Sequence, residues 1–137
     1  MDQIAVDMRV KQLLGLAEKE HKENLNRASL LSCLGAEIST TFKQKNHLDR
    51  NDFKKLDKLE KLTKAIRSAA GGSDDPSEAK EIPPDLPQVI SKMAELAEAL
   101  KDEVEKTPRH VVSATVIDQA NVLLELIRRV RGLSART

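Results

Sequence analysis

Residues 107–132 read TPRHVVSATVIDQANVLLELIRRVRG, and their apolar side chains recur in steps of three and four. That spacing is the period of an α-helix, so the stretch predicts a helix that begins near Thr107–Pro108 and ends at Gly132. At about 100° per residue, the apolar face is broad and leaves one continuous polar strip, which consists of Asp118, Asn121, Glu125 and Arg128.

A surface helix of a small bundle normally buries a narrower apolar stripe than this one. The last helix is therefore either central in its own chain or shared with a second subunit. We expect the chain to self-associate and to bind a helix of another protein, and we assign the apolar face to a protein interface. The interface residues predicted on this helix are Val111, Val112, Val116, Leu123, Leu126, Ile127 and Val130.

A second helical pattern covers the N-terminal third of the chain. Apolar residues recur from Val6 to Ala17, pause at EKEHKEN (18–24), and resume in phase from Leu25 to Phe42. The pattern predicts one helix over about residues 3–45 or two helices with a break near Asn24–Asn26. A continuous helix would be roughly 60 Å long, more than the shorter helices can cover, so that its excess would bind another chain.

Small side chains lie within this first pattern at helical spacing. Ala28, Ser32 and Gly35 would let a second helix backbone approach closely, and Gly15 and Gly35 each cost a helix about 1 kcal/mol relative to alanine. Close packing would offset that cost. We assign Ala28, Ser32 and Gly35 to a helix contact and include them in the predicted protein interface, although the facing helix can belong to the same chain or to another.

The remaining segments complete an all-α fold. The segment from Phe53 to Ile66 predicts a helix with a cap at Asp49 or Asn51 and an end at Gly71–Gly72. GGSDDPSEAKEIPP (71–84) is a Pro/Gly/acidic linker, and Asp85 with Gln88 predicts a capping-box start for a helix over about 86–104.

The predicted fold therefore has four principal helices, arranged as two antiparallel pairs that form a bundle. We divide the chain into an N-terminal helical pair (1–70), the linker (71–84) and a C-terminal hairpin (85–133). The alternative is that both pairs form one combined bundle.

Charge is segregated along the chain. Residues 43–67 hold nine basic and four acidic groups, whereas residues 72–106 hold four basic and ten acidic groups. A row of lysines on the second helix could follow a phosphate backbone, or it could simply be a solvated face. The candidate nucleic-acid contacts are Lys54, Lys55, Lys58, Lys61 and Lys64.

Catalytic and cofactor patterns are absent from the sequence. Glu18 and His21 have the spacing of one half of a di-iron motif without the other half, so we predict no metal, no cofactor and no enzyme. Cys33 is the one cysteine, which we expect to be buried in a reduced, cytoplasmic protein. No apolar run is long enough to span a membrane. The sequence thus predicts a non-catalytic, self-associating helical assembly subunit, with an accessory nucleic-acid-binding subunit as the alternative.

Overall fold

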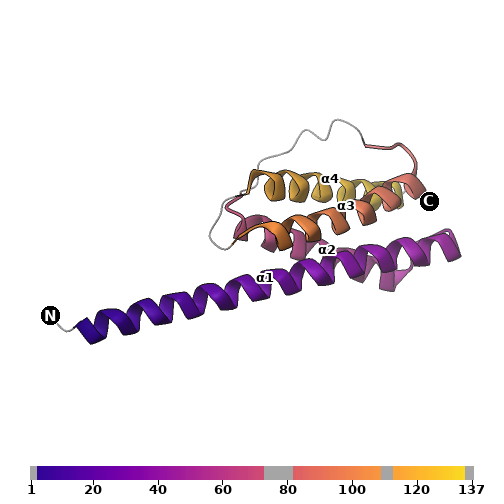
Figure 1. The fold of residues 1–137 in the computed structure, drawn as a ribbon. Helices are drawn as coiled ribbons and strands as arrows, with labels where there is room; N and C mark the ends of the chain where they lie inside the picture. Colours follow the sequence, from indigo (N-terminus) through magenta and orange to yellow (C-terminus); the bar gives the residue numbers. More distant parts are fainter. Residues whose placement is uncertain (1–2, 73–81, 109–112, 135–137) are drawn as a thin grey trace.

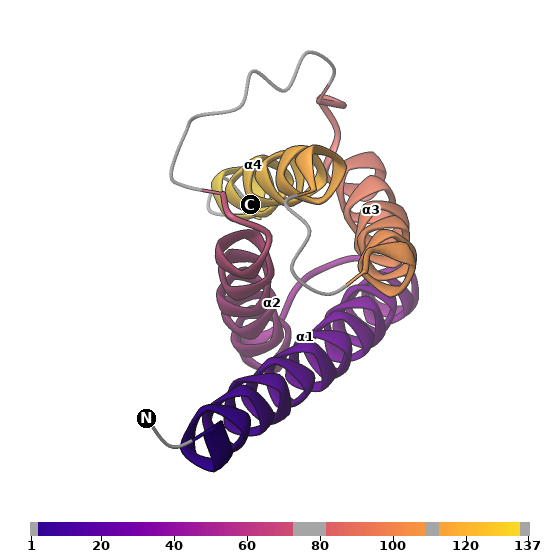
Figure 2. The ribbon, with the colours of Figure 1, turned by 60° about the vertical axis from the view of Figure 1, so that its left-hand side comes forward.

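The structure, a computed structural model, describes residues 3–72, 82–108 and 113–134, with the backbone alone at 3–7 and 14. These residues form four helices: α1 Gln3–Lys45, α2 Arg50–Ala69, α3 Leu86–Lys106 and α4 Ala114–Ser134. α1 and α4 each pack against both α2 and α3, so every helix has two neighbours (Figure 2). The predicted all-α bundle of four helices is confirmed.

The direction of the helices makes every neighbouring pair antiparallel. α1 and α4 run one way along the bundle and α2 and α3 run the other way (Figure 1). The end of α2 and the start of α3 therefore lie at opposite ends of the bundle. The connection between them has to span the length of the bundle, as in four-helix folds with a long crossover.

One hydrophobic core receives side chains from all four helices. Because the sequence has no Trp and no Tyr, the core consists mainly of aliphatic side chains that interdigitate between the helices. Its fully buried large members include Leu31, Ile38, Leu56, Leu59, Ile90, Met93, Leu100, Leu123, Leu126 and Ile127.

α1 is a single unbroken helix of 43 residues, which decides between the two sequence alternatives. It ends in a turn at Asn46, whose φ of 62° lies in the left-handed region that asparagine tolerates better than most residues. The backbone N–H of Asp52 donates to Oδ1 of Asp49 at 2.9 Å, and the Asp49 N–H donates to Oδ2 of Asp52 at 2.9 Å. This capping box starts α2, and a hydrogen bond from Lys45 lowers the pKa of Asp49.

α2 ends at the predicted glycine pair. Gly71 has a φ of 91°, and the N–H groups of Gly71 and Gly72 donate to the carbonyls of Ser68 at 3.1 Å and Arg67 at 2.9 Å. This hydrogen-bond pattern is a Schellman motif, which needs a left-handed residue after the helix and so favours glycine.

The start of α3 is as predicted but its capping contact is not, and the start of α4 differs from the prediction. Asp85 is the N-cap of α3, but its side chain makes no capping hydrogen bond, so the predicted capping box with Gln88 does not form. Thr107 does not open α4: it is the C-cap of α3, and its hydroxyl donates to the carbonyl of Glu103 at 2.7 Å. α4 begins instead after Ser113, whose hydroxyl accepts from the N–H of Val116 at 3.2 Å.

Hydrogen bonds and ion pairs connect α2 to α4. Arg67 is buried and donates through Nη1 to Oδ1 of Asn121 at 3.1 Å, and Asn121 is buried although it belongs to the polar strip of the last helix. Arg131 donates to Glu60 at 2.7 Å and to Asp57 at 2.5 Å. Partial burial pushes the pKa of Glu60 upward, but the hydrogen bonds and charges of Arg131 and Lys64 together leave that pKa below its ordinary value.

Candidate functional site

The N-terminal half of α1 projects beyond the other three helices (Figure 1). α2 has 20 residues and α3 and α4 have 21 each, so they can cover only about half of the 43 residues of α1. The first buried side chain of α1 among those described is Ala28. We call residues 3–24 the arm; at 1.5 Å per residue it is about 33 Å long.

The arm carries four of the five large apolar side chains that are exposed among the described residues. Exposed fractions are 58% for Met8, 49% for Val10, 66% for Leu13 and 57% for Leu16, and Leu30 at 37% is the only other large apolar side chain described as exposed. Single exposed apolar residues are ordinary on protein surfaces, but a cluster on one element marks an interaction site.

Part of this surface repeats the core-facing pattern of the same helix. Five helical turns take about 18 residues, so Val10, Leu13, Leu16 and Ala17 point in the same directions as Ala28, Leu31, Leu34 and Gly35. The latter four are buried in the bundle. We call Val10, Leu13, Leu16 and Ala17 the arm face. It continues the core stripe of α1 into a region where the described chain provides no covering helix.

One charged residue lies at each end of the arm face along the helix. Arg9 precedes it and Glu20 follows it, and both side chains are exposed. The two residues lie about three helical turns apart, so their side chains point to the same side of α1. That side is the one on which the arm face lies.

The predicted interface residues of α4 lie inside the chain. Val116, Leu123, Leu126, Ile127 and Val130 are at most 2% exposed. Val111 and Val112 fall outside the described residues. The prediction that α4 leaves an apolar surface exposed for a partner is therefore wrong for these five residues.

These five residues belong to the core that the four helices share, and α4 is also contacted by segments outside its two neighbouring helices. Ile82, just before α3, packs on the core beside Leu133, and a Cβ on Gly72 would lie 3.0 Å from the side chain of Ile117. Both ends of the crossover connection thus contact α4. Periodicity along one helix does not reveal such coverage by a distant segment.

The three small residues predicted to contact a helix lie in or beside contacts within the same chain. They are Ala28, Ser32 and Gly35. Ala28 is buried in the core, and a Cβ on Gly35 would lie 3.1 Å from Cβ of Ala97 and 3.4 Å from Cα of Ala94. Ser32 lies at the edge of this contact with α3. The close approach predicted for the small residues is therefore made within the chain, between α1 and α3.

Gly15 differs from Gly35 although the sequence treats them alike. A Cβ on Gly15 would meet nothing within 4 Å. Nothing in the structure explains a glycine at this position of the arm.

The five predicted lysines lie on α2. Lys54, Lys58 and Lys61 are exposed and form no ion pair with any described residue. Lys55 pairs with Glu37 at 3.4 Å and Lys64 pairs with Glu60 at 3.6 Å. The structure thus leaves three of the five lysines as an exposed row, which we call the lysine row, and ties the other two to carboxylates.

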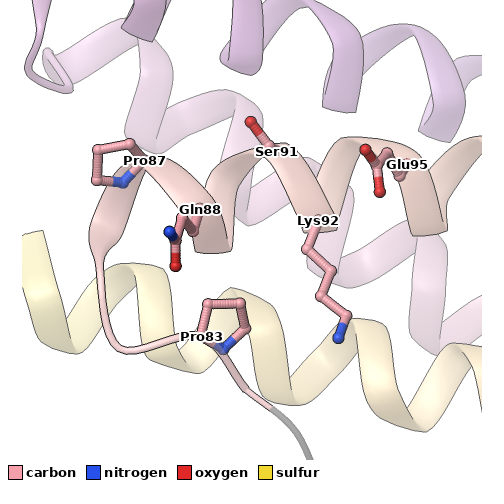
Figure 3. Close-up of a pocket in the computed structure, with 6 residues that line it drawn as sticks. All are labelled: Pro83, Pro87, Gln88, Ser91, Lys92 and Glu95. Atoms are coloured by element: carbon pink, nitrogen blue, oxygen red, sulfur yellow. The ribbon is translucent and has the colours of Figure 1, made fainter.

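Pockets add no convergent chemistry to the described part of the chain. Figure 3 shows an open depression of about 500 Å³ at the start of α3, lined by Pro83, Pro87, Gln88, Ser91, Lys92 and Glu95. Within residues 3–72, 82–108 and 113–134, no group of His, Cys, Asp or Glu side chains is arranged to hold a metal ion. Cys33, which we expected to be buried, is exposed, and its thiol lies 3.6 Å from Oε1 of Glu37.

Known proteins offer no guide to this arrangement. The chain matches no protein-family model, no curated protein and no solved structure. None of the described helices is long and apolar enough to cross a membrane. Among the described residues, the arm face and the lysine row are therefore the two surfaces suited to binding a partner.

The sequence contained a signal for the arm. The length of the first helical pattern exceeded the length of the others, and this indicated an excess. The predicted interface nevertheless named residues from Ala28 onward and from the last helix. Val10, Leu13, Leu16 and Ala17 were missed because a residue's periodicity shows which way it points, but not whether a partner helix is there.

Proposed function

We propose that this protein is a non-catalytic assembly subunit that self-associates through the arm face. The carrying observation is that Val10, Leu13 and Leu16 are about half to two-thirds exposed while they continue the core stripe of α1. Covering apolar side chains of this size stabilises an interface by about 1–3 kcal/mol each when burial is complete. A helix pair is the natural way to cover such a face, as it is within the bundle.

The proposal predicts that Leu13→Glu weakens self-association. A charge in the centre of the arm face would have to lose its hydration on pairing, so we expect the association constant to fall by at least about tenfold. Sedimentation velocity between about 1 µM and 1 mM of the full chain measures it.

The matched control is Gln12→Glu, which adds the same charge at the neighbouring, exposed position on another side of the arm. It should leave association unchanged, and circular dichroism should show that both variants keep the helical content of the parent. A parent chain that stays monomeric throughout this range would refute the proposed function.

The lysine row supports a second candidate function, an accessory role in binding nucleic acid through phosphates. Its support is that Lys54, Lys58 and Lys61 are exposed and follow one side of α2 without ion pairs to described residues. Lysines spaced along one helix face contact a phosphate backbone without reading base sequence.

For this candidate, replacing all three lysines by glutamine should weaken binding to duplex DNA and make it less dependent on salt. Each lost phosphate contact reduces the slope of log K against log salt by about 0.9. Fluorescence anisotropy across a salt titration measures both effects. The control replaces Lys11, Lys19 and Lys22 of the arm by glutamine; equal losses in the two triple variants, or no loss in either, would contradict a specific role for the lysine row.

A further inference from the structure

The bundle itself indicates which kind of helix covers the core-facing side of α1. In the bundle, that side contacts α2 and α3, and both run antiparallel to α1 (Figure 1). The arm face repeats the same directions with Val10, Leu13, Leu16 and Ala17, so an antiparallel helix would continue the packing that α1 makes along the rest of its length.

The charges at the two ends of the arm face favour a second copy of the arm in an antiparallel rather than a parallel arrangement. Arg9 and Glu20 point toward the direction of the arm face from its opposite ends. In a parallel pair, each would lie opposite its own equivalent, which brings like charges together. In an antiparallel pair, Arg9 of one arm lies beside Glu20 of the other, and the contact occurs twice by symmetry.

The register agrees with this pairing. An antiparallel pair centred on the arm face, just after Leu13, places Arg9 and Glu20 of the two copies within about 3 Å of each other along the helix axis. Their long side chains can bridge that offset. The two bundles then lie at opposite ends of the paired arms, because each arm leaves its bundle at one end only.

We infer that the partner of the arm is the arm of a second copy of this chain, paired antiparallel with Arg9 of each copy against Glu20 of the other. The inference rests on the proposed function, since it names the occupant of the same arm face. It adds orientation and register, which the proposed function leaves open.

Charge reversal tests the orientation. Arg9→Glu and Glu20→Lys should each weaken the dimer by about tenfold, because each replaces two attractive contacts with two repulsive ones. The double variant Arg9→Glu/Glu20→Lys restores the opposite charges and should return to the affinity of the parent chain. Lys19→Glu, on the outer side of the arm, is the control and should have no such effect.

Mixing the parent chain with the double variant supplies the decisive comparison. In an antiparallel pair, Arg9 of the parent would meet the lysine substituted at position 20 of the variant. Glu20 of the parent would likewise meet the glutamate substituted at position 9, so the two chains should form no mixed dimer. In a parallel pair the same mixture would place opposite charges together and favour mixed dimers. Energy transfer between dyes attached to exposed Cys33 reports mixing.

The outcomes separate the two proposals. Weakening by both single variants, recovery in the double variant and exclusion from mixed dimers would support antiparallel pairing. Dimers that Leu13→Glu disrupts, but that ignore the single reversals or mix freely, would overturn the antiparallel inference and leave the proposed function standing. A monomeric parent chain would overturn both.

Discussion

Leu126→Ala should lower the free energy of unfolding by about 2–5 kcal/mol, because it removes buried methyl groups and leaves a cavity in a packed core. Leu126 is 0% exposed and belongs to the core cluster to which all four helices contribute. Urea denaturation monitored by circular dichroism measures the change. The same experiment tests whether the broad apolar face of α4 packs within its own chain or against a partner.

The matched control is Leu13→Ala in the arm, where the side chain is 66% exposed. A truncation at an exposed position usually changes the free energy of unfolding by no more than about 0.5 kcal/mol. To separate folding from assembly, both variants should be measured at a concentration where the Leu13→Glu chain and the parent chain are monomeric. A loss below about 1 kcal/mol for Leu126→Ala would contradict the placement of α4 in the core.

Gly35→Leu should destabilise the bundle by about 2–3 kcal/mol, because α1 and α3 would have to move apart to admit the new side chain. A Cβ alone at this position would already lie 3.1 Å from Cβ of Ala97, which leaves no room for three further carbon atoms. The loss should exceed the gain of about 1 kcal/mol in helix propensity that comes from replacing glycine.

Gly132→Leu is the control for this prediction, since it makes the same substitution where a Cβ would meet nothing within 4 Å. It should be neutral or stabilising in urea denaturation. Equal stability of Gly35→Leu and the parent chain would show that α1 and α3 do not approach as closely as the structure has them.

Local patterns in the sequence predicted most of the fold. The steps of three and four predicted the helices, Asp49 was one of the two residues expected to cap α2, and Gly71 marked the end of α2. Each of these features depends on residues within a few positions of one another. The start of α4 was misplaced because Thr107 followed by Pro108 resembles a helix start. In the structure the Thr107 hydroxyl bonds back to α3 instead.

The candidate site depends on contacts between distant segments, and the sequence did not reveal these contacts. The coverage of α4 includes Gly72 and Ile82, which lie against it from outside its own pattern, and the exposure of Leu13 depends on where α2 and α3 end. Cys33 was expected to be buried because of its neighbours in the sequence. On the helix, however, it lies one turn before Glu37, on the outer side of α1.

The unbroken course of α1 has a consequence for how the arm becomes helical. An isolated helix of the arm's length would have to form its first turn in water, and that step is unfavourable by a factor of about a thousand. Residues 25–45 already present a formed turn on which the arm can elongate one hydrogen bond at a time. The bundle therefore acts as a template from which the helix of the arm can elongate.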